Sequence, residues 1–365
     1  MNKVKEHFHG SDLEKVEKVF GIKKEDITSF GANVNPLGIS PMLRADLSAH
    51  IDAITSYPDR EYTDLRNAIS IYTKAPLSSI MVGNGSTELI GLFIQIQNPK
   101  KALILSPTYS EYEREISLSG GSCLYHYLKE ENQFHIDIDA LLADITAEID
   151  LLIICNPNNP TSTIIPRQEM EQIVKHCQKT DTFVLIDETY IEFSPDMEAV
   201  TSIPLTKHYP NMVILRGISK FFAAPGLRLG YSICSNEALY DRMKEIKNPW
   251  TINSLAGVAG EIMFSDHDYI HHSKAFTHTE RAYCQEQLDA MDHVRYYDSY
   301  GNFILVKILK EGLTSSDLFV HCIKKGLMIR DCSDFAGLDE TFVRFCFMSH
   351  EKNVALMDAF REVLS

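Results

Sequence analysis

The sequence lacks the patterns that mark several large classes of protein. No apolar run approaches the length of a membrane span, and the first eight residues hold no apolar signal core, so we expect a cytoplasmic protein without membrane contact. No long basic run is present, and 35 basic against 50 acidic residues give a net charge of −15, which argues against nucleic acid as a partner. The G-x-G-x-x-G and Walker A motifs are absent as well.

Patterns for metal binding and disulfides are also missing. The eight cysteines form no C-x-x-C pair and no Cys/His ligand spacing, and several lie in apolar runs, as Cys155 does. We interpret them as reduced core thiols. The fourteen histidines include the pair His271-His272, but no H-E-x-x-H motif occurs. We therefore interpret this pair as the polar surface of a long helix and predict no metal site.

What is present is an alternation of short apolar runs with helical patterns. The 365 residues, 44% of them hydrophobic, suffice for one large and one smaller core. Near-continuous apolar runs, typical of buried parallel strands, cover residues 102–105, 151–155, 183–186 and 213–215. Helical patterns lie between them at residues 111–118, 138–145 and 168–177. This alternation predicts an α/β domain with a mostly parallel sheet, in which ligands bind at the carboxyl ends of the strands.

The two ends of the chain follow other patterns. Ser11 and Asp12 precede a predicted capped helix at residues 13–20, which Gly21 ends. After Trp250 a long helical region extends to about residue 291. Strand-like runs at 303–308, 327–329 and 342–347 then alternate with helical patterns at 317–324 and 354–364, which indicates a small α+β domain.

One lysine is set apart by its neighbours. Lys220 lies between residues 215 and 230 among apolar and small residues, and Arg228 follows eight positions later. Most lysines are solvated surface charges, but a desolvated amine near a second cation has a lowered pKa and attacks carbonyls. The planar fork of Arg228, beside a glycine-rich turn, suits a phosphate. Pyridoxal 5′-phosphate (PLP), held as a Schiff base, carries both groups and fits both residues.

Further candidates lie where the predicted strands and one helix begin or end. Gly85, Ser86 and Thr87 open an apolar helix, whose free N–H groups can bind an anion. The residues that follow the four predicted parallel strands are Tyr109, Asn159, Asp187 and Lys220. An aspartate after a strand is often only structural. An ionised Asp187 would, however, keep the pyridine nitrogen of PLP protonated.

The stretch around Lys220 resembles the lysine motif of the aminotransferase class I/II family of fold-type I PLP enzymes. The resemblance covers essentially the whole chain. It implies an N-terminal arm at residues 1–40, a large domain with a mostly parallel seven-stranded sheet at 41–247, and a small α+β domain at 248–365. Within the family, His9-Gly10, Asn33-Val-Asn-Pro-Leu-Gly38 and Arg330-Asp-Cys332 are most similar to threonine-phosphate decarboxylases, which are relatives of histidinol-phosphate aminotransferases.

The resemblance implies roles in holding the cofactor. Tyr109 would stack on the PLP ring, and Asn159 and Tyr190 would donate to its 3′ oxygen. Ser219 and Arg228 would join residues 85–87 around its phosphate. Tyr57, otherwise a packing residue before a proline turn, would reach the cofactor of the partner subunit in a homodimer. The chain departs from the family at Ser162, usually glycine, and at Gly217, usually serine or threonine.

The resemblance also implies roles in holding a substrate. Arg344 would bind the substrate α-carboxylate, and Arg330 would bind its phosphate, although arginines in edge strands are usually surface charges. His9 and either Asn33 or Asn35 would lie nearby. Asparagines in such a loop can also serve only as turn formers.

The implied reaction is decarboxylation of O-phospho-L-threonine to aminopropanol phosphate, a side-chain precursor in cobalamin biosynthesis. The same parts also serve transamination, so a histidinol-phosphate aminotransferase using 2-oxoglutarate stays open, as does a serine-phosphate decarboxylase. The chain has no room for the DNA-binding domain of a PLP-dependent regulator. An inactive scaffold is disfavoured by the complete set of Lys220, Asp187 and Arg228.

Overall fold

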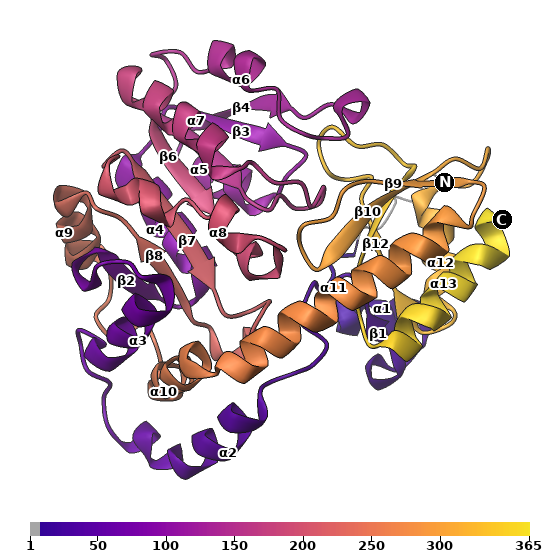
Figure 1. Cartoon of the computed structure of the whole chain (residues 1–365), viewed down its shortest axis with the longest axis horizontal. Helices are drawn as coiled ribbons and strands as arrows, with labels where there is room; N and C mark the ends of the chain where they lie inside the picture. The colour runs from indigo at the N-terminus through magenta and orange to yellow at the C-terminus, as the bar shows by residue number, and fades with distance from the viewer. Residues whose placement is uncertain (1–7) are drawn as a thin grey trace.

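The computed structural model describes residues 8–365, so the expectations for residues 1–7 lie outside the described part of the chain. Its centre is a seven-stranded sheet in the order β2-β8-β7-β6-β5-β3-β4 (Figure 1). The strands are β2 (Ile80–Gly83), β3 (Lys101–Ser106), β4 (Ser122–Tyr127), β5 (Leu151–Cys155), β6 (Phe183–Asp187), β7 (Met212–Gly217) and β8 (Gly230–Ile233). β8 runs antiparallel to both neighbours, and all other pairs are parallel, which confirms the mostly parallel sheet.

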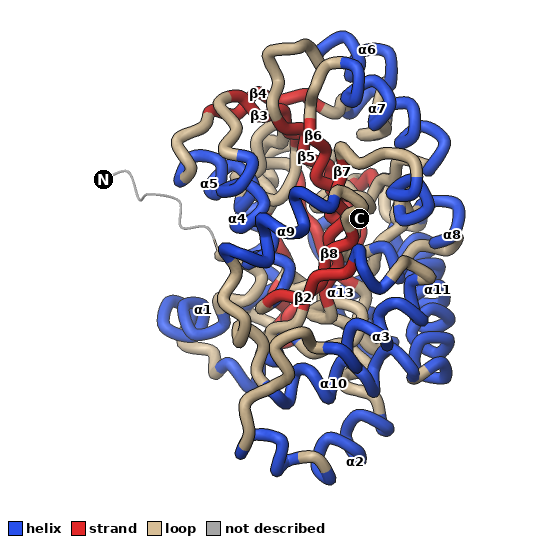
Figure 2. The backbone as a smooth tube through the Cα atoms, turned by 90° about the vertical axis from the view of Figure 1, so that its left-hand side faces the viewer, coloured by secondary structure: helices blue, strands red, loops and turns tan. Residues whose placement is uncertain are grey.

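Helices cover both faces of this sheet, as Figure 2 shows. One face packs against α4 (Gly85–Gln97), α5 (Glu111–Leu118) and α9 (Glu237–Ile246). The other face packs against α3 (Thr63–Thr73), α6 (Ile138–Asp144), α7 (Arg167–Lys179) and α10 (Ser254–Ser265). Apart from the partly exposed edge strand β4, the strands are buried on both faces, because each supplies apolar side chains to two cores. Two further helices, α2 (Pro41–Ala49) and the short α8 (Met197–Val200), complete this part.

The smaller part of the molecule contains a four-stranded antiparallel sheet in the order β12-β13-β10-β9. Its strands are β9 (Val294–Tyr296), β10 (Phe303–Ile308), β12 (Arg330–Asp331) and β13 (Phe342–Cys346). Its helices are α11 (His267–Asp289), α12 (Ser315–Ile323) and α13 (His350–Leu364). In Figure 1 the long α11 runs from the end of α10 to the smaller part, where it lies beside α12 and α13. The predicted small α+β unit is therefore present.

The N-terminal segment joins this smaller part. β1 (Thr28–Ser29) pairs in parallel with β11 (Leu327–Met328), and apolar residues around α1 (Leu13–Phe20) lie in the same core as α12 and α13. α1 ends at Gly21, which has a φ of 70°, as predicted. The predicted N-cap is wrong in one respect. The Asp12 side chain accepts from the backbone N–H of His9 and makes no capping bond to the helix.

Two further details concern boundaries. The strand expected at residues 327–329 is two short strands in different sheets, because Met328 pairs with Ser29 whereas Arg330 pairs with Arg344. Buried residues of α10, among them Ala256 and Phe264, belong to the core of the large sheet. The division of the chain at residue 248 therefore stays a prediction.

No helix in residues 8–365 is both long and apolar enough to cross a membrane. All eight cysteines are free thiols, and seven of them are buried.

Candidate active site

The expected site residues gather at the carboxyl ends of β5, β6 and β7, where the N-terminal segment crosses the sheet. Asp187 ends β6, and Lys220 follows the end of β7 by three residues. The backbone N–H of Asn35 donates to the Lys220 carbonyl oxygen at 2.9 Å, and Lys220 Nζ donates to the Ala32 carbonyl oxygen at 2.7 Å. The arm and the lysine loop thus form one site at the edge where α/β sheets bind ligands.

Lys220 is a partly buried amine near two other cations. Its pKa is lowered to about 8, first by burial and then by the positive charge of Arg344, with a smaller effect from Arg228. A substantial fraction of such an amine is unprotonated near neutral pH. It can therefore act as a nucleophile toward a carbonyl group.

Asp187 is a buried carboxylate that receives three hydrogen bonds. The backbone N–H and hydroxyl of Thr189 donate to Oδ1 at 2.9 and 2.5 Å, and the Tyr112 hydroxyl donates to Oδ2 at 2.7 Å. Burial raises the pKa of Asp187, and these donors oppose that shift. Sequence analysis missed Tyr112. The available signal was a tyrosine three positions after Tyr109, at the start of a predicted helix.

The amino terminus of α4 and Arg228 form an anion-binding corner. Gly85, Ser86 and Thr87 occupy the first turn of α4, whose N–H groups have no helical partners. Gly85 has a φ of 80°, and a Cβ there would lie 2.4 Å from Nη2 of Arg228. Only glycine thus lets the guanidinium come this close. The helix dipole and the Arg228 cation favour the same negative group.

Of the three residues expected around the cofactor ring, Asn159 and Tyr190 contact candidate substrate residues, whereas Tyr109 packs against Tyr112. The Tyr109 ring meets that of Tyr112 edge-on, with centroids 5.5 Å apart, and burial raises the pKa of Tyr109 to about 12. Asn159 is buried, and its Oδ1 accepts from Nη1 of Arg344. The Tyr190 hydroxyl accepts from Nδ2 of Asn33 at 3.3 Å. The candidates for ring binding and substrate binding are therefore in direct contact.

The two candidate substrate arginines face each other across a strand pair. Arg330 on β12 lies opposite Arg344 on β13, so both side chains leave the same face of the small sheet. Both are buried. Nη2 of Arg344 donates to the Gly31 carbonyl oxygen at 2.7 Å, while its Nε has no partner among residues 8–365. Burial lowers the pKa of Arg344. Its unpartnered N–H is available to an anionic oxygen.

Arg330 differs because an acidic residue already contacts it. Its Nη2 donates to Oδ1 and Oδ2 of Asp334 at 2.8 and 2.6 Å, and its Nη1 donates to the Phe8 carbonyl oxygen at 3.0 Å. His9 is close enough that its pKa is lowered, first by partial burial and then by the charge of Arg330. Sequence analysis did not anticipate Asp334.

The two candidate asparagines of the arm have different surroundings. Nδ2 of Asn35 donates to the Phe221 carbonyl oxygen at 2.8 Å and to Ser273 Oγ at 2.9 Å, and its Oδ1 accepts from Leu37 N–H at 3.1 Å. Asn35 therefore anchors the arm. Asn33 Oδ1 is buried without a partner among the described residues, so Asn33 is the one that can offer an oxygen to a ligand.

The two remaining candidates are Ser219 and Tyr57. Ser219 precedes Lys220 and is half-buried. Tyr57 is 84% exposed, and its ring packs against Trp250 with centroids 5.4 Å apart.

The chemistry of these groups matches PLP. The Lys220 amine suits its carbonyl, the Asp187 carboxylate suits its pyridine nitrogen, and the amino terminus of α4 with Arg228 suits its phosphate. A family model described as aminotransferase class I and II matches residues 25–360. The chain belongs to this family. It is a PLP-dependent enzyme.

Individual members of the family show how far the similarity reaches. The threonine-phosphate decarboxylase of Salmonella typhimurium is 32% identical over 98% of this chain and 96% of its own length. The crystal structure of a histidinol-phosphate aminotransferase from Clostridium acetobutylicum superposes with a TM-score of 0.86, is 32% identical, and covers 92% of this chain and 98% of its own. A histidinol-phosphate aminotransferase from Sinorhizobium meliloti, solved with pyridoxal-5′-phosphate, has a TM-score of 0.83 at 20% identity and covers 96% and 93% of the two chains.

The structure gives a role to Ser162, one of the two departures from the family pattern, and shows no steric need for the other, Gly217. Ser162 has a φ of 62°, a backbone conformation that favours glycine. Its Oγ accepts from the backbone N–H of Tyr300 at 3.2 Å and of Gly301 at 2.8 Å, so the hydroxyl ties the Asn159 loop to the smaller part. A Cβ at Gly217 would lie 3.6 Å from Ser86 Oγ, so the site has room for a side chain there.

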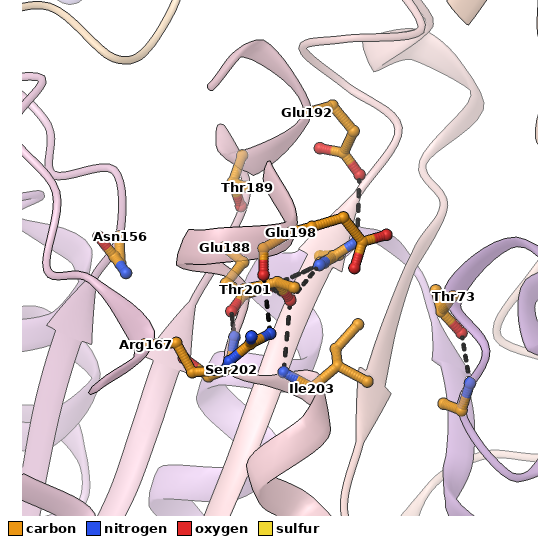
Figure 3. A network of polar contacts seen from close by, with 12 residues as sticks. Thr73, Asn156, Arg167, Glu188, Thr189, Glu192, Glu198, Thr201, Ser202 and Ile203 are labelled. Atoms are coloured by element: carbon orange, nitrogen blue, oxygen red, sulfur yellow. Dashed lines mark hydrogen bonds and ion pairs between the residues drawn. The ribbon is translucent and has the colours of Figure 1, made fainter. Parts of the chain in front are cut away.

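A second polar cluster lies beside the site without contributing a predicted residue. Arg216 on β7 is buried and donates to Glu188 Oε2 through Nε at 3.0 Å and Nη2 at 2.7 Å. Glu192 lies 3.7 Å from its Nη1, and Thr201 accepts from its Nη2 at 2.7 Å. Figure 3 shows Glu188, Glu192 and Thr201 converging in this network. Glu188 directly follows Asp187, so the network supports the end of β6.

Proposed function

We propose that this PLP-dependent enzyme decarboxylates O-phospho-L-threonine to aminopropanol phosphate, a precursor in cobalamin biosynthesis. One observation carries the proposal: two buried arginines, Arg330 and Arg344, lie opposite each other on β12 and β13 beside the Lys220 loop. Phosphothreonine has two anionic ends, a carboxylate and a phosphate, and each suits one guanidinium. Histidinol phosphate has only one anionic end, whereas the 2-oxoglutarate of a transamination has two carboxylates.

Bound PLP supplies an electron sink for the bond that breaks at the substrate Cα. Arg344 would hold the carboxylate and so set the rotation that places the Cα–carboxylate bond perpendicular to the ring. CO2 leaves with that bond, and one proton takes its place on Cα. Lys220, with its pKa lowered to about 8, can carry that proton. Tyr109 would cover one face of the ring and exclude water.

A second candidate is transamination of histidinol phosphate. It is supported by the similarity to the aminotransferase of Clostridium acetobutylicum, which equals the decarboxylase relative in identity. The two reactions differ in which bond at Cα is held perpendicular to the ring, and the same residues serve both. Serine-phosphate decarboxylation differs from the first proposal by one substrate methyl group.

A homodimer with shared sites belongs to the proposal. Tyr57 is largely exposed and packs on Trp250, itself 44% exposed. An exposed aromatic pair of this kind suits burial against a second copy. We expect a dimeric mass by light scattering. We also expect faster PLP loss from Tyr57→Phe than from the control Tyr127→Phe, whose ring is also exposed. An active monomer would contradict the shared site.

The deciding experiment supplies two substrates separately. Purified enzyme with O-phospho-L-threonine should release CO2 and an aminoalcohol phosphate, and Lys220→Ala should release neither. In parallel, histidinol phosphate with 2-oxoglutarate is assayed for glutamate. Glutamate formed at a far higher rate than CO2 would show that the second candidate is the right one.

A further inference from the structure

The ion pair of Arg330 and Asp334 lies in the wall of a cavity of about 100 Å³. The other wall includes Thr108, Tyr109 and Ser110. The cavity thus connects the expected ring-stacking residue with the expected site for the distal anion. Asp334 is the one carboxylate that forms an ion pair with a candidate substrate arginine within residues 8–365.

Arg330 is positioned by contacts other than Asp334. Its Nη1 donates to the Phe8 carbonyl oxygen at 3.0 Å, and its guanidinium lies 5.1 Å from the centre of the Phe335 ring. Its backbone is paired with that of Arg344 in the small sheet. The guanidinium should therefore keep its place when the carboxylate leaves.

Asp334 is the more accessible partner of the pair. Its side chain is 33% exposed, whereas that of Arg330 is 8% exposed. A carboxylate at the rim can turn toward water at little cost, because exposed ion pairs contribute little net stability. A buried guanidinium cannot, since it would have no solvent to replace the lost oxygens.

Acidic side chains offset Arg330 at this end of the site, because Asp334 pairs with it and Glu113 lines the same cavity. Arg330 contributes one positive charge and Asp334 one negative charge. His9 adds little, because burial and the nearby Arg330 lower its pKa. A phosphate that enters beside the intact pair would meet no net attraction.

We propose that Asp334 is an exchangeable counter-ion of Arg330: the phosphate end of the ligand takes its place on the guanidinium, and Asp334 returns when the product leaves. The inference rests on the proposed function in one respect, that the distal group of the substrate is a phosphate. The exchange weakens every phosphate-bearing ligand by the same factor, since each displaces the same carboxylate. It leaves ligands with a neutral distal group unaffected.

The test measures binding of inorganic phosphate to the PLP-loaded enzyme by calorimetry, and of O-phospho-L-threonine and L-threonine by spectral titration. Asp334→Asn removes the competing charge with little change in shape. Asp339→Asn is the matched control, because Asp339 lies in the same loop and its carboxylate accepts hydrogen bonds from Thr341 and not from an arginine within residues 8–365. We expect Asp334→Asn to tighten phosphate and phosphothreonine about two- to fivefold each, the range of one partly exposed ion pair. L-threonine and the control should not change.

Three outcomes overturn the exchange. Unchanged or weaker phosphate binding in Asp334→Asn would mean that Asp334 positions Arg330 instead. Equal tightening of phosphate binding in Asp339→Asn would show that the effect comes only from the change in the net charge of the protein. Phosphate binding that survives Arg330→Ala would place the anion elsewhere. If Asp334→Asn tightens inorganic phosphate while phosphothreonine is never decarboxylated, the exchange stands and the proposed function fails.

Discussion

The molecule buries cationic side chains in two neighbouring places and balances them differently. Arg216 faces two carboxylates, Glu188 at 2.7 Å and Glu192 at 3.7 Å. Arg344 is equally buried, but its hydrogen-bond acceptors within residues 8–365 are the neutral oxygens of Asn159 and Gly31.

The pKa values of these groups reflect whether a carboxylate lies beside each cation. Burial opposes the charge of Arg216, but Glu188 and Glu192 more than compensate and raise its pKa. Burial lowers the pKa of Arg344 and of Lys220 without such compensation. A balanced buried charge is typical of structural support, whereas unbalanced cations in a site await an anionic ligand. The comparison therefore separates Arg216, which supports the fold, from Arg344, which can bind an anion. Arg330, whose counter-ion Asp334 is partly exposed, stands between the two.

The largest effect is expected at Arg216, the buried cation that has carboxylate partners. Arg216→Met leaves Glu188 and Glu192 buried without their cation, and should lower the free energy of unfolding by about 3–5 kcal/mol. Urea denaturation of the cofactor-free protein measures it. Arg242→Ala, at an exposed ion pair with Glu245, should cost less than about 0.5 kcal/mol. If Arg216→Met lowered the free energy of unfolding as little as Arg242→Ala does, the two buried regions could not be distinguished by their charge balance.

The second prediction concerns the arginines of the candidate substrate site. Arg344→Ala should lower kcat/KM for the true substrate by a factor equivalent to about 2–5 kcal/mol, because an anion in a closed site loses its partner. Its free energy of unfolding should change far less than that of Arg216→Met, since no buried carboxylate is stranded. Arg330→Ala should reduce the preference for phosphothreonine over threonine, whereas Arg344→Ala should impair both. Similar unfolding losses at 216 and 344 would contradict the comparison.

A smaller effect is expected at Asp187, the carboxylate of the site that neutral donors support. Tyr112→Phe removes one hydrogen bond to the charged form, worth about 1.5–3 kcal/mol, and should raise the pKa of Asp187 further. The folded-state pKa is already raised above the unfolded value, so the folded protein holds the extra proton and stability falls as pH rises through that interval.

This fall should be larger and extend to higher pH in cofactor-free Tyr112→Phe than in the wild type. Unfolding free energies measured at a series of pH values test it, with Tyr127→Phe as the control. Identical pH profiles for Tyr112→Phe and wild type would show that the phenol does not support the carboxylate.

The smallest effect concerns the link between the two parts. Ser162→Ala keeps the strained φ and removes the acceptor of the Gly301 backbone N–H, while the Tyr300 N–H keeps the Ser162 carbonyl oxygen at 2.9 Å. This variant should cost about 1–2 kcal/mol of stability. Ser162→Gly relieves the strain and should cost less. Thermal unfolding of both variants gives the order. A glycine variant less stable than the alanine variant would show that strain at residue 162 is negligible.

The parallel strands and the lysine loop were predictable because their signals are local. Strands buried on both faces must be apolar throughout, as residues 151–155 and 183–186 are, and their ends mark the ligand edge. The apolar run at residues 327–329 led to a wrong prediction because such a signal is only local. An apolar run predicts a strand but does not say which neighbour it pairs with, and here two sheets divide it.

Two contacts that sequence analysis missed join residues far apart in the chain. Tyr112 meets Asp187, 75 positions away, and Ser162 meets Gly301, 139 positions away. Asp334 was readable as an acid near Arg330, but nothing in the spacing says that it contacts the guanidinium rather than solvent. The same limit applies to Asn33 and Asn35, which look alike in the sequence and differ only in how many partners surround each amide.

The sequence by itself determined the cofactor chemistry and the alternating α/β plan, because amine, carboxylate and glycine-rich turn are properties of residue type and local order. Only the tertiary structure decided which buried charges are balanced. Charge balance depends on which distant side chains come within hydrogen-bonding distance and on how far water is excluded from them. Those two quantities turn Arg216 into a support of β6 and leave Lys220 and Arg344 ready for an anion.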